Sequence, residues 1–155
     1  MRPNSKHKAI YLDVCALGRP YDDLTIIRNQ IEAAAVDVIV AFIKNGEYKL
    51  FYSPIHGIEI AENQDVIART EIKELFKEYG ENLARIVKDV ILGSRAITLF
   101  SKVFGPSDAF HVAYAENINA SFITCDDNLL RKCTNIGLKI WFGTPVDFCR
   151  KEGLI

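Results

Sequence analysis

The stretch FITCDD (residues 122–127) runs from apolar, β-prone residues straight into two acidic ones. The same order occurs near the start of the chain, where KAIYL (residues 8–12) is followed by Asp13. Short apolar runs rich in β-branched and aromatic residues are typical of buried strands. We therefore predict strands over 8–12 and 121–124, each followed by a carboxylate.

Working outward from these two strands, the chain alternates strand patterns with helix patterns and shows no repeat or linker. Such alternation predicts an α/β fold with a mostly parallel central sheet and helices on both faces. The pattern favours one domain over 1–155, with 1–7 as a flexible tail. Residues 19–23 are expected to form a loop. Further strands are expected at 48–52, 96–99 and 138–142, and helices at 24–43, from Pro54, at 64–79, 81–92, 109–115 and 127–133, and after Pro145.

Composition narrows the class of protein. The chain has 155 residues, of which 49% are hydrophobic and 25% charged, and its formal net charge is −1. This balance argues against disorder and against a protein that coats nucleic acid by bulk charge. No apolar run is long enough for a membrane span, and the run at 9–12 is too short for a signal peptide, so a cytoplasmic location without membrane contact is expected. The four cysteines match no zinc spacing, and we expect reduced thiols.

Four acidic residues lie beside apolar segments instead of in charged runs. Asp13 and Asp126 follow strands, Glu59 lies within IHGIEI (residues 55–60), and Asp108 opens a helix with no other charge until Glu116. Carboxyl ends of parallel strands meet at one edge of a sheet, where ligands bind. Carboxylates gathered there repel one another and favour a cation, and oxygen ligands select Mg²⁺ or Mn²⁺. Such ions can promote attack of water on a phosphodiester.

The sequence resembles the PIN domain, the fold of VapC-type toxin ribonucleases and related nucleases. Four segments carry the resemblance: YLDVC (11–15), Ser53 with Glu59 six residues on, SDAFHVA (107–113) and FITCDD (122–127). The segment RPYDD (19–23) resembles that of a subgroup of predicted PIN proteins that share Asp-x-Cys near the start.

The resemblance implies residue roles. Asp13, Glu59, Asp108 and Asp126 would form the catalytic acidic cluster that binds Mg²⁺ or Mn²⁺, and Thr124 would orient the last carboxylate. Two positions depart from the pattern: Cys15 stands where many members have Asn, Ser or Thr, and Asn128 where many have a further acid. Asp127 could substitute for that acid or cap a helix. From its position, Arg19 could hold a substrate phosphate or pair with Asp22 or Asp23.

The expected function is that of a metal-dependent endoribonuclease that hydrolyses single-stranded RNA. The resemblance also implies a toxin, an antitoxin as inhibitory partner, and a homodimer. A different class stays open, namely a nucleic-acid-binding or regulatory module that kept the fold and lost cleavage. We interpret His111, one turn after Asp108, as a packed core histidine and not as a base. Lys102, Arg131 and Lys132 could supply a local positive rim, or could be solvated.

Overall fold

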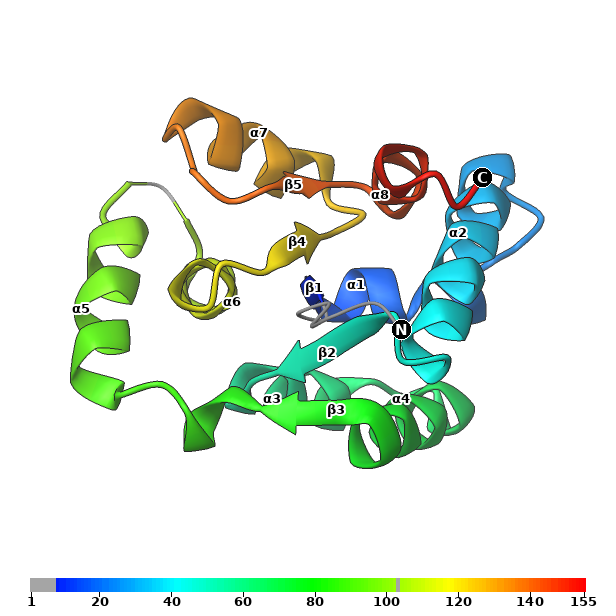
Figure 1. The fold of residues 1–155 in the computed structure, drawn as a ribbon, viewed down its shortest axis with the longest axis horizontal. Helices are drawn as coiled ribbons and strands as arrows, with labels where there is room; N and C mark the ends of the chain where they lie inside the picture. The colour runs from blue at the N-terminus through cyan, green and yellow to red at the C-terminus, as the bar shows by residue number, and fades with distance from the viewer. Residues whose placement is uncertain (1–7, 103) are drawn as a thin grey trace, which may run out of the picture.

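The structure, a computed structural model, describes residues 8–102 and 104–155, so the tail expected at 1–7 lies outside the described residues. Its centre is a five-stranded, all-parallel sheet in the order β3-β2-β1-β4-β5 (Figure 1). The strands are β1 (Lys8–Leu12), β2 (Tyr48–Tyr52), β3 (Gly80–Asn82), β4 (Ser121–Ile123) and β5 (Phe142–Gly143). The first strand of the chain is therefore the middle strand of the sheet, and the predicted parallel α/β class is confirmed.

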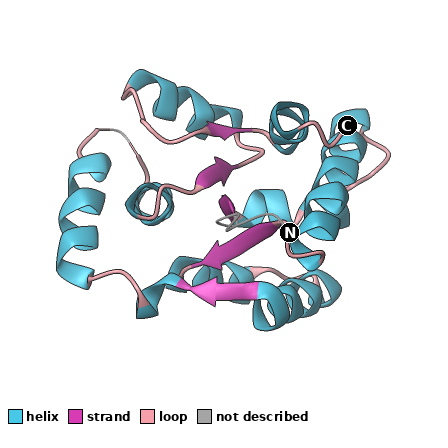
Figure 2. Ribbon diagram, viewed as in Figure 1, coloured by secondary structure: helices cyan, strands magenta, loops and turns pink. Residues whose placement is uncertain are grey.

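Helices cover both faces of the sheet, as Figure 2 shows. The helices are α1 (Val14–Leu17), α2 (Ile27–Lys44), α3 (Pro54–Glu62), α4 (Val66–Tyr79), α5 (Asp89–Phe100), α6 (Pro106–Asn117), α7 (Asp127–Asn135) and α8 (Pro145–Glu152). Helices α5, α6 and α7 supply the core on one face, and α2, α4 and α8 supply the core on the other. Helix α3 lies at the edge where the strands end.

The central strand shows why its sequence is apolar throughout. Ile10 and Leu12 face the α2–α4–α8 core, whereas Tyr11 faces the α5–α6–α7 core, and all three are fully buried. A strand covered on both faces has no solvated side, so its residues do not alternate between apolar and polar. This burial holds the position that follows Leu12, the start of the acidic edge, in a rigid frame.

Two expectations for the middle of the chain are wrong. Residues 81–92 were expected to form a helix and 96–99 a strand, but β3 and a 3₁₀ turn (Leu83–Arg85) come first and α5 runs through both Gly93 and 96–99. Leu92, Ala96 and Leu99 are buried at helical spacing and pack on α6. A short apolar run cannot by itself distinguish a strand from a buried helix, and the tertiary contact with α6 decides it.

Smaller differences lie at element ends. The strand expected at 138–142 pairs only at Phe142–Gly143, and the loop expected at 19–23 contains a 3₁₀ turn at Arg19–Tyr21. The four-residue helix α1 follows Asp13 and was not expected. Over the part of the chain that the structure describes, no helix combines the length and hydropathy needed to cross a membrane. All four cysteines are free thiols, and three of them are buried.

Candidate active site

The carboxyl ends of β1 and β4 place Asp13 beside the segment that carries Asp126. Leu12 pairs with Ile123 across the two strands, and the Asp13 amide donates to the Ile123 carbonyl at 3.1 Å. The Asp13 side chain is only 6% exposed, and its Oδ1 caps α1 by accepting the Ala16 amide at 3.0 Å. The short helix α1 thus forms because this carboxylate satisfies an otherwise free helix donor.

Cys15 and Thr124 connect the two strand ends. The Cys15 thiol donates to Asp13 Oδ1 at 3.0 Å, and its sulfur lies 3.3 Å from the Thr124 hydroxyl oxygen. That hydroxyl oxygen accepts the Asp126 amide at 3.0 Å, and Asp126 Oδ1 caps α7 by accepting the Leu129 amide at 3.1 Å. Thr124 therefore orients the backbone of Asp126, and the Cys15 thiol supplies a hydrogen bond to Asp13.

Glu59 reaches the same edge from α3, and a buried histidine holds it there. His111 Nε2 lies 2.5 Å from Glu59 Oε1, and His111 Nδ1 lies 2.5 Å from the hydroxyl of Tyr11. That hydroxyl also lies 2.9 Å from Ser53 Oγ. The hydrogen-bonded chain Ser53–Tyr11–His111–Glu59 runs from the start of α3, through β1 and α6, back to α3.

A second histidine fixes the position of α3. His56 Nδ1 accepts the Ser53 amide at 3.0 Å, so its Nε2 carries the proton and donates to the Leu12 carbonyl at 2.7 Å. The ring is fully buried, and burial lowers the pKa of His56 to about 3, with the nearby His111 acting in the same direction. A neutral His56 thereby ties α3 to the end of β1, one turn before Glu59.

Asp108, in the first turn of α6, shows that the carboxylates share one electrostatic environment. Its pKa is raised, first by burial and then by the negative charge of Asp126, and Glu59 adds to the shift. His111 and Lys132 act in the opposite direction. Burial also raises the pKa of Asp13, against hydrogen bonds from Thr124 and Cys15. The edge of the sheet thus carries an excess of negative charge, and Lys132 belongs to its rim.

The residues at this edge fit a hard divalent cation by their chemistry. Carboxylate oxygens are the ligands that Mg²⁺ and Mn²⁺ prefer, and after burial the negative charges of Asp126 and Glu59 add to the raised pKa of Asp108, a repulsion that a cation would relieve. Within residues 8–102 and 104–155, no three His, Cys, Asp or Glu side chains are close enough to hold a metal ion as they stand. The carboxylates lie at the same edge of the sheet but do not converge on one point where a metal ion could bind.

Two predicted residues point elsewhere. Arg28 binds the Asp127 carboxylate with both terminal nitrogens, at 2.6 and 2.8 Å, and these hydrogen bonds lower the pKa of Asp127. Asp127 therefore pairs with α2 and does not join the acidic cluster. Arg19 forms an ion pair with Asp22 at 2.8 Å, one of the two roles left open for it.

The sequence suggests no role at the site for Tyr11 or His56, indicates Ser53 only as a helix cap, and favours a packing role alone for His111. His111 is packed, at 1% exposure, but both of its ring nitrogens are also hydrogen-bonded. A usable sequence pattern existed, because His111 follows Asp108 by three residues on the same helix face. The partners on β1 and α3 could not be found without the fold.

The fold, a five-stranded parallel sheet in the order β3-β2-β1-β4-β5 with helices on both faces, is PIN-like. A chain in the crystal structure of FitAcB from Neisseria gonorrhoeae superimposes with a TM-score of 0.53 at 12% sequence identity, over 88% of this chain and 97% of that one. No family model and no curated protein matches the sequence. At this identity the likeness shows the fold alone.

Proposed function

We propose that the protein is a metal-dependent endoribonuclease that hydrolyses phosphodiester bonds of single-stranded RNA, with Asp13, Glu59, Asp108 and Asp126 as its catalytic and metal-binding residues. The observation that carries the proposal is geometric: Asp13 and the segment of Asp126 follow the paired strands β1 and β4, and Glu59 is hydrogen-bonded to His111 on α6, the helix whose first turn contains Asp108. Asp13 and Asp126 also cap helices, whereas no described hydrogen bond gives the Asp108 side chain such a role.

The protein's own side chains position the carboxylates and supply positive charge near the substrate. Thr124 and Cys15 hold the end of β1 against the end of β4, while His111 holds Glu59. The four carboxylates would hold Mg²⁺ or Mn²⁺, which would supply Lewis acidity to acidify a water and to offset charge on the phosphate. Lys132 adds positive charge at the rim, where it attracts the phosphate backbone.

Two exposed apolar surfaces are candidates for contact with protein partners. Helix α5 exposes Val90 (81%), Ile97 (72%) and Phe100 (55%), large apolar side chains that a lone soluble domain seldom presents together on one helix. This surface supports a homodimer. Ile27 and Ile31 on α2 are exposed as well, and they offer a second place for a protein partner. We propose a cytoplasmic toxin with an antitoxin that covers it.

A gel assay with purified protein, Mg²⁺ or Mn²⁺ and mixed RNA tests the activity. We expect cleavage that EDTA abolishes and that Asp108→Asn reduces by about 100-fold or more, in the range expected for loss of a charged group in the transition state. Asp108 is the better target because Asp13 and Asp126 also cap helices. Glu62→Gln, at an exposed acid on the same helix as Glu59, is the matched control and should leave cleavage unchanged. Cleavage in EDTA, or equal cleavage by Asp108→Asn, would refute the proposal.

One observation favours a second function, a nucleic-acid-binding module without cleavage: among the described residues the carboxylates are not preassembled around one metal. A thermal-shift titration separates the two. An intact metal site raises the melting temperature with Mn²⁺ concentration by mass action, whereas a binder without chemistry gives no such rise.

A further inference from the structure

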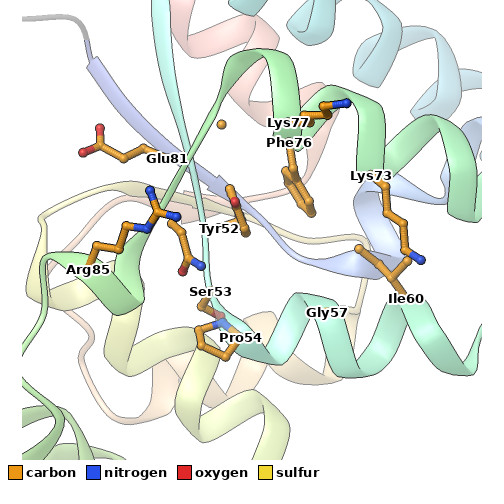
Figure 3. A pocket seen from close by; sticks show the side chains of 12 residues that line it. Tyr52, Ser53, Pro54, Gly57, Ile60, Lys73, Phe76, Lys77, Glu81 and Arg85 are labelled. Carbon is orange, nitrogen blue, oxygen red and sulfur yellow. The ribbon is translucent and has the colours of Figure 1, made fainter.

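A cavity of about 600 Å³ opens on the other side of α3 from the acidic edge. It lies where β2 and β3 end, between α3 and α4, and none of the four predicted catalytic carboxylates lines it. Figure 3 shows its lining: Tyr52 and Phe76 lie at the centre, Arg85 on one side, and Lys73 and Lys77 on the opposite side. Its volume is in the range of cavities that hold small ligands.

The cavity is positive in a chain whose net charge is −1. Three cationic side chains line it, and Lys73, Lys77 and Arg85 form no ion pair with any described residue. Its one acid, Glu81, lies 3.5 Å from the ammonium of Lys49, which offsets its charge. Three such cations around one concave surface favour an anion with several oxygens.

The floor of the cavity is aromatic. The rings of Tyr52 and Phe76 stack, with centroids 4.5 Å apart and planes 15° apart, and Tyr52 is only half-buried. Gly80 permits this arrangement, because a Cβ there would lie 2.9 Å from the Tyr52 ring. Asn82 Oδ1 accepts the Ala84 amide at 3.0 Å, which occupies its acceptor and leaves its NH₂ group as a donor. Flat, cationic and hydrogen-bonding surfaces thus meet in one place.

The cavity and the acidic edge share two structural elements. Gly57 and Ile60 line the cavity from α3, the helix that also carries Glu59. Ser53 lines it as well, and Ser53 Oγ is the first member of the hydrogen-bonded chain that ends on Glu59. A ligand in the cavity therefore lies next to the end of a network that positions a carboxylate of the candidate active site.

We propose that this cavity binds one nucleotide of the RNA strand, with its base against Tyr52 and the two phosphates that flank it held on opposite sides, one by Lys73 and Lys77 and the other by Arg85. The proposal rests on the proposed function, since it places a second point of attachment for the same substrate beyond the cleaved bond. Aromatic platforms beside cations are the usual means of holding single-stranded nucleic acid without reading its sequence. Asn82 adds a donor that can discriminate among base edges.

RNA binding measured in EDTA tests the cavity separately from cleavage. A fluorescent single-stranded oligonucleotide is titrated with the full-length protein and with Lys73→Ala/Lys77→Ala and Arg85→Ala. We expect Kd to rise roughly tenfold, and the log–log salt slope to fall by about 0.7 for each phosphate that a variant no longer neutralises. Lys88→Ala, at an exposed lysine three residues from Arg85 and outside the cavity, is the matched control and should keep both values. Circular dichroism verifies that each variant is folded.

The outcomes separate the two proposals. Unchanged Kd and salt slope in both cavity variants would overturn the cavity assignment, whatever the cleavage assay shows. If the cavity variants bind RNA more weakly than the parent but the parent cleaves no RNA, the result would support the cavity and refute the nuclease. Competition with uridine and adenosine monophosphates shows whether a free nucleotide suffices or a strand is needed. Equal competition by poly-glutamate would overturn a nucleotide site, because a peptide polyanion carries no base.

Discussion

His111 Nε2 and Glu59 Oε1 lie 2.5 Å apart, which joins a fully buried imidazole to a carboxylate of the candidate active site. The other ring nitrogen is bonded to Tyr11, so the ring cannot turn without breaking a buried hydrogen bond. The direction of the Glu59 side chain is thus set by groups inside the core. His111 is a positioning residue in this arrangement.

Replacing His111 with Phe should uncouple Glu59 from the core. The buried Tyr11 hydroxyl is then without one of its partners, so we expect the free energy of unfolding to fall by about 1–3 kcal/mol. The concentration of Mn²⁺ that gives half the maximal thermal shift should rise, and kcat should fall more than KM rises. Equal metal response in His111→Phe and the parent, at reduced stability, would assign His111 a packing role only.

Asp108→Asn should stabilise the metal-free protein. The pKa of Asp108 is raised, so its ionised form opposes folding, and this cost appears as the pH rises through that pKa. We expect the variant to melt up to about 3 °C higher at pH 7, since roughly 1 kcal/mol moves the melting temperature of a domain this size by that amount. The difference should shrink in acid.

The Asp108→Asn variant should also show little of the Mn²⁺-dependent rise in melting temperature. A metal response as large as that of the parent would show that Asp108 is misassigned.

Acid should destabilise the fold through His56. Its pKa in the fold is about 3, against 6.5 for an exposed histidine, so the unfolded chain binds more protons between these values. Stability is therefore retained above about pH 6.5 and lost as the pH falls toward 3, by at most about 1.4 kcal/mol per pH unit. Urea unfolding at several pH values measures this slope. His56→Gln should flatten it, and an unchanged slope would place the acid sensitivity elsewhere.

The four thiols should titrate in two groups. Cys15 is exposed as a residue, but its sulfur is part-buried against Asp13, and its pKa is raised, first by a hydrogen bond with Cys125 and then by burial. It should therefore react with a thiol reagent more slowly than free cysteine at about pH 8. Cys125, Cys133 and Cys149 are buried and should react only on unfolding. Denaturation without reductant should release four equivalents per chain. Fewer than four would reveal a disulfide.

The exposed apolar face of α5 should mediate a homodimer. Ile97 is 72% exposed, so Ile97→Glu should leave the fold intact while placing a charge in the interface. Sedimentation should give a mass near twice 17.5 kDa for the parent and near 17.5 kDa for the variant. A monomeric parent at high concentration, or a dimeric variant, would exclude this face.

The ends of β1 and β4 could be predicted from the sequence, because both are short apolar runs followed by acids. It also placed Ser53 and Pro54 at a helix start, where the serine and His56 do form a capping box. It failed at α5, whose helical state depends on packing against α6, an interaction between segments that the local pattern does not encode.

Part of the candidate site could likewise be predicted from the sequence, and part could not. The acids are candidates because carboxylates beside apolar residues are unusual, but the residues that hold them are ordinary core residues in sequence. Tyr11 reads as strand core, and only the pairing of β1 with β4 and the approach of α6 show that its hydroxyl connects Ser53 to His111. Asp127 was ambiguous because Arg28, its partner, lies 99 residues away.

The central place of β1 in the sheet also governs when the acidic edge comes into being during synthesis. Asp13 is made early, but its neighbour strand β4 is completed only at Ile123, and the Asp13 amide bonds to that residue. At roughly 5–20 residues per second, the ribosome needs about 6–22 seconds to travel from one to the other. Until then a growing chain cannot form this contact, so the acidic edge assembles only after residues 14–123 have been made.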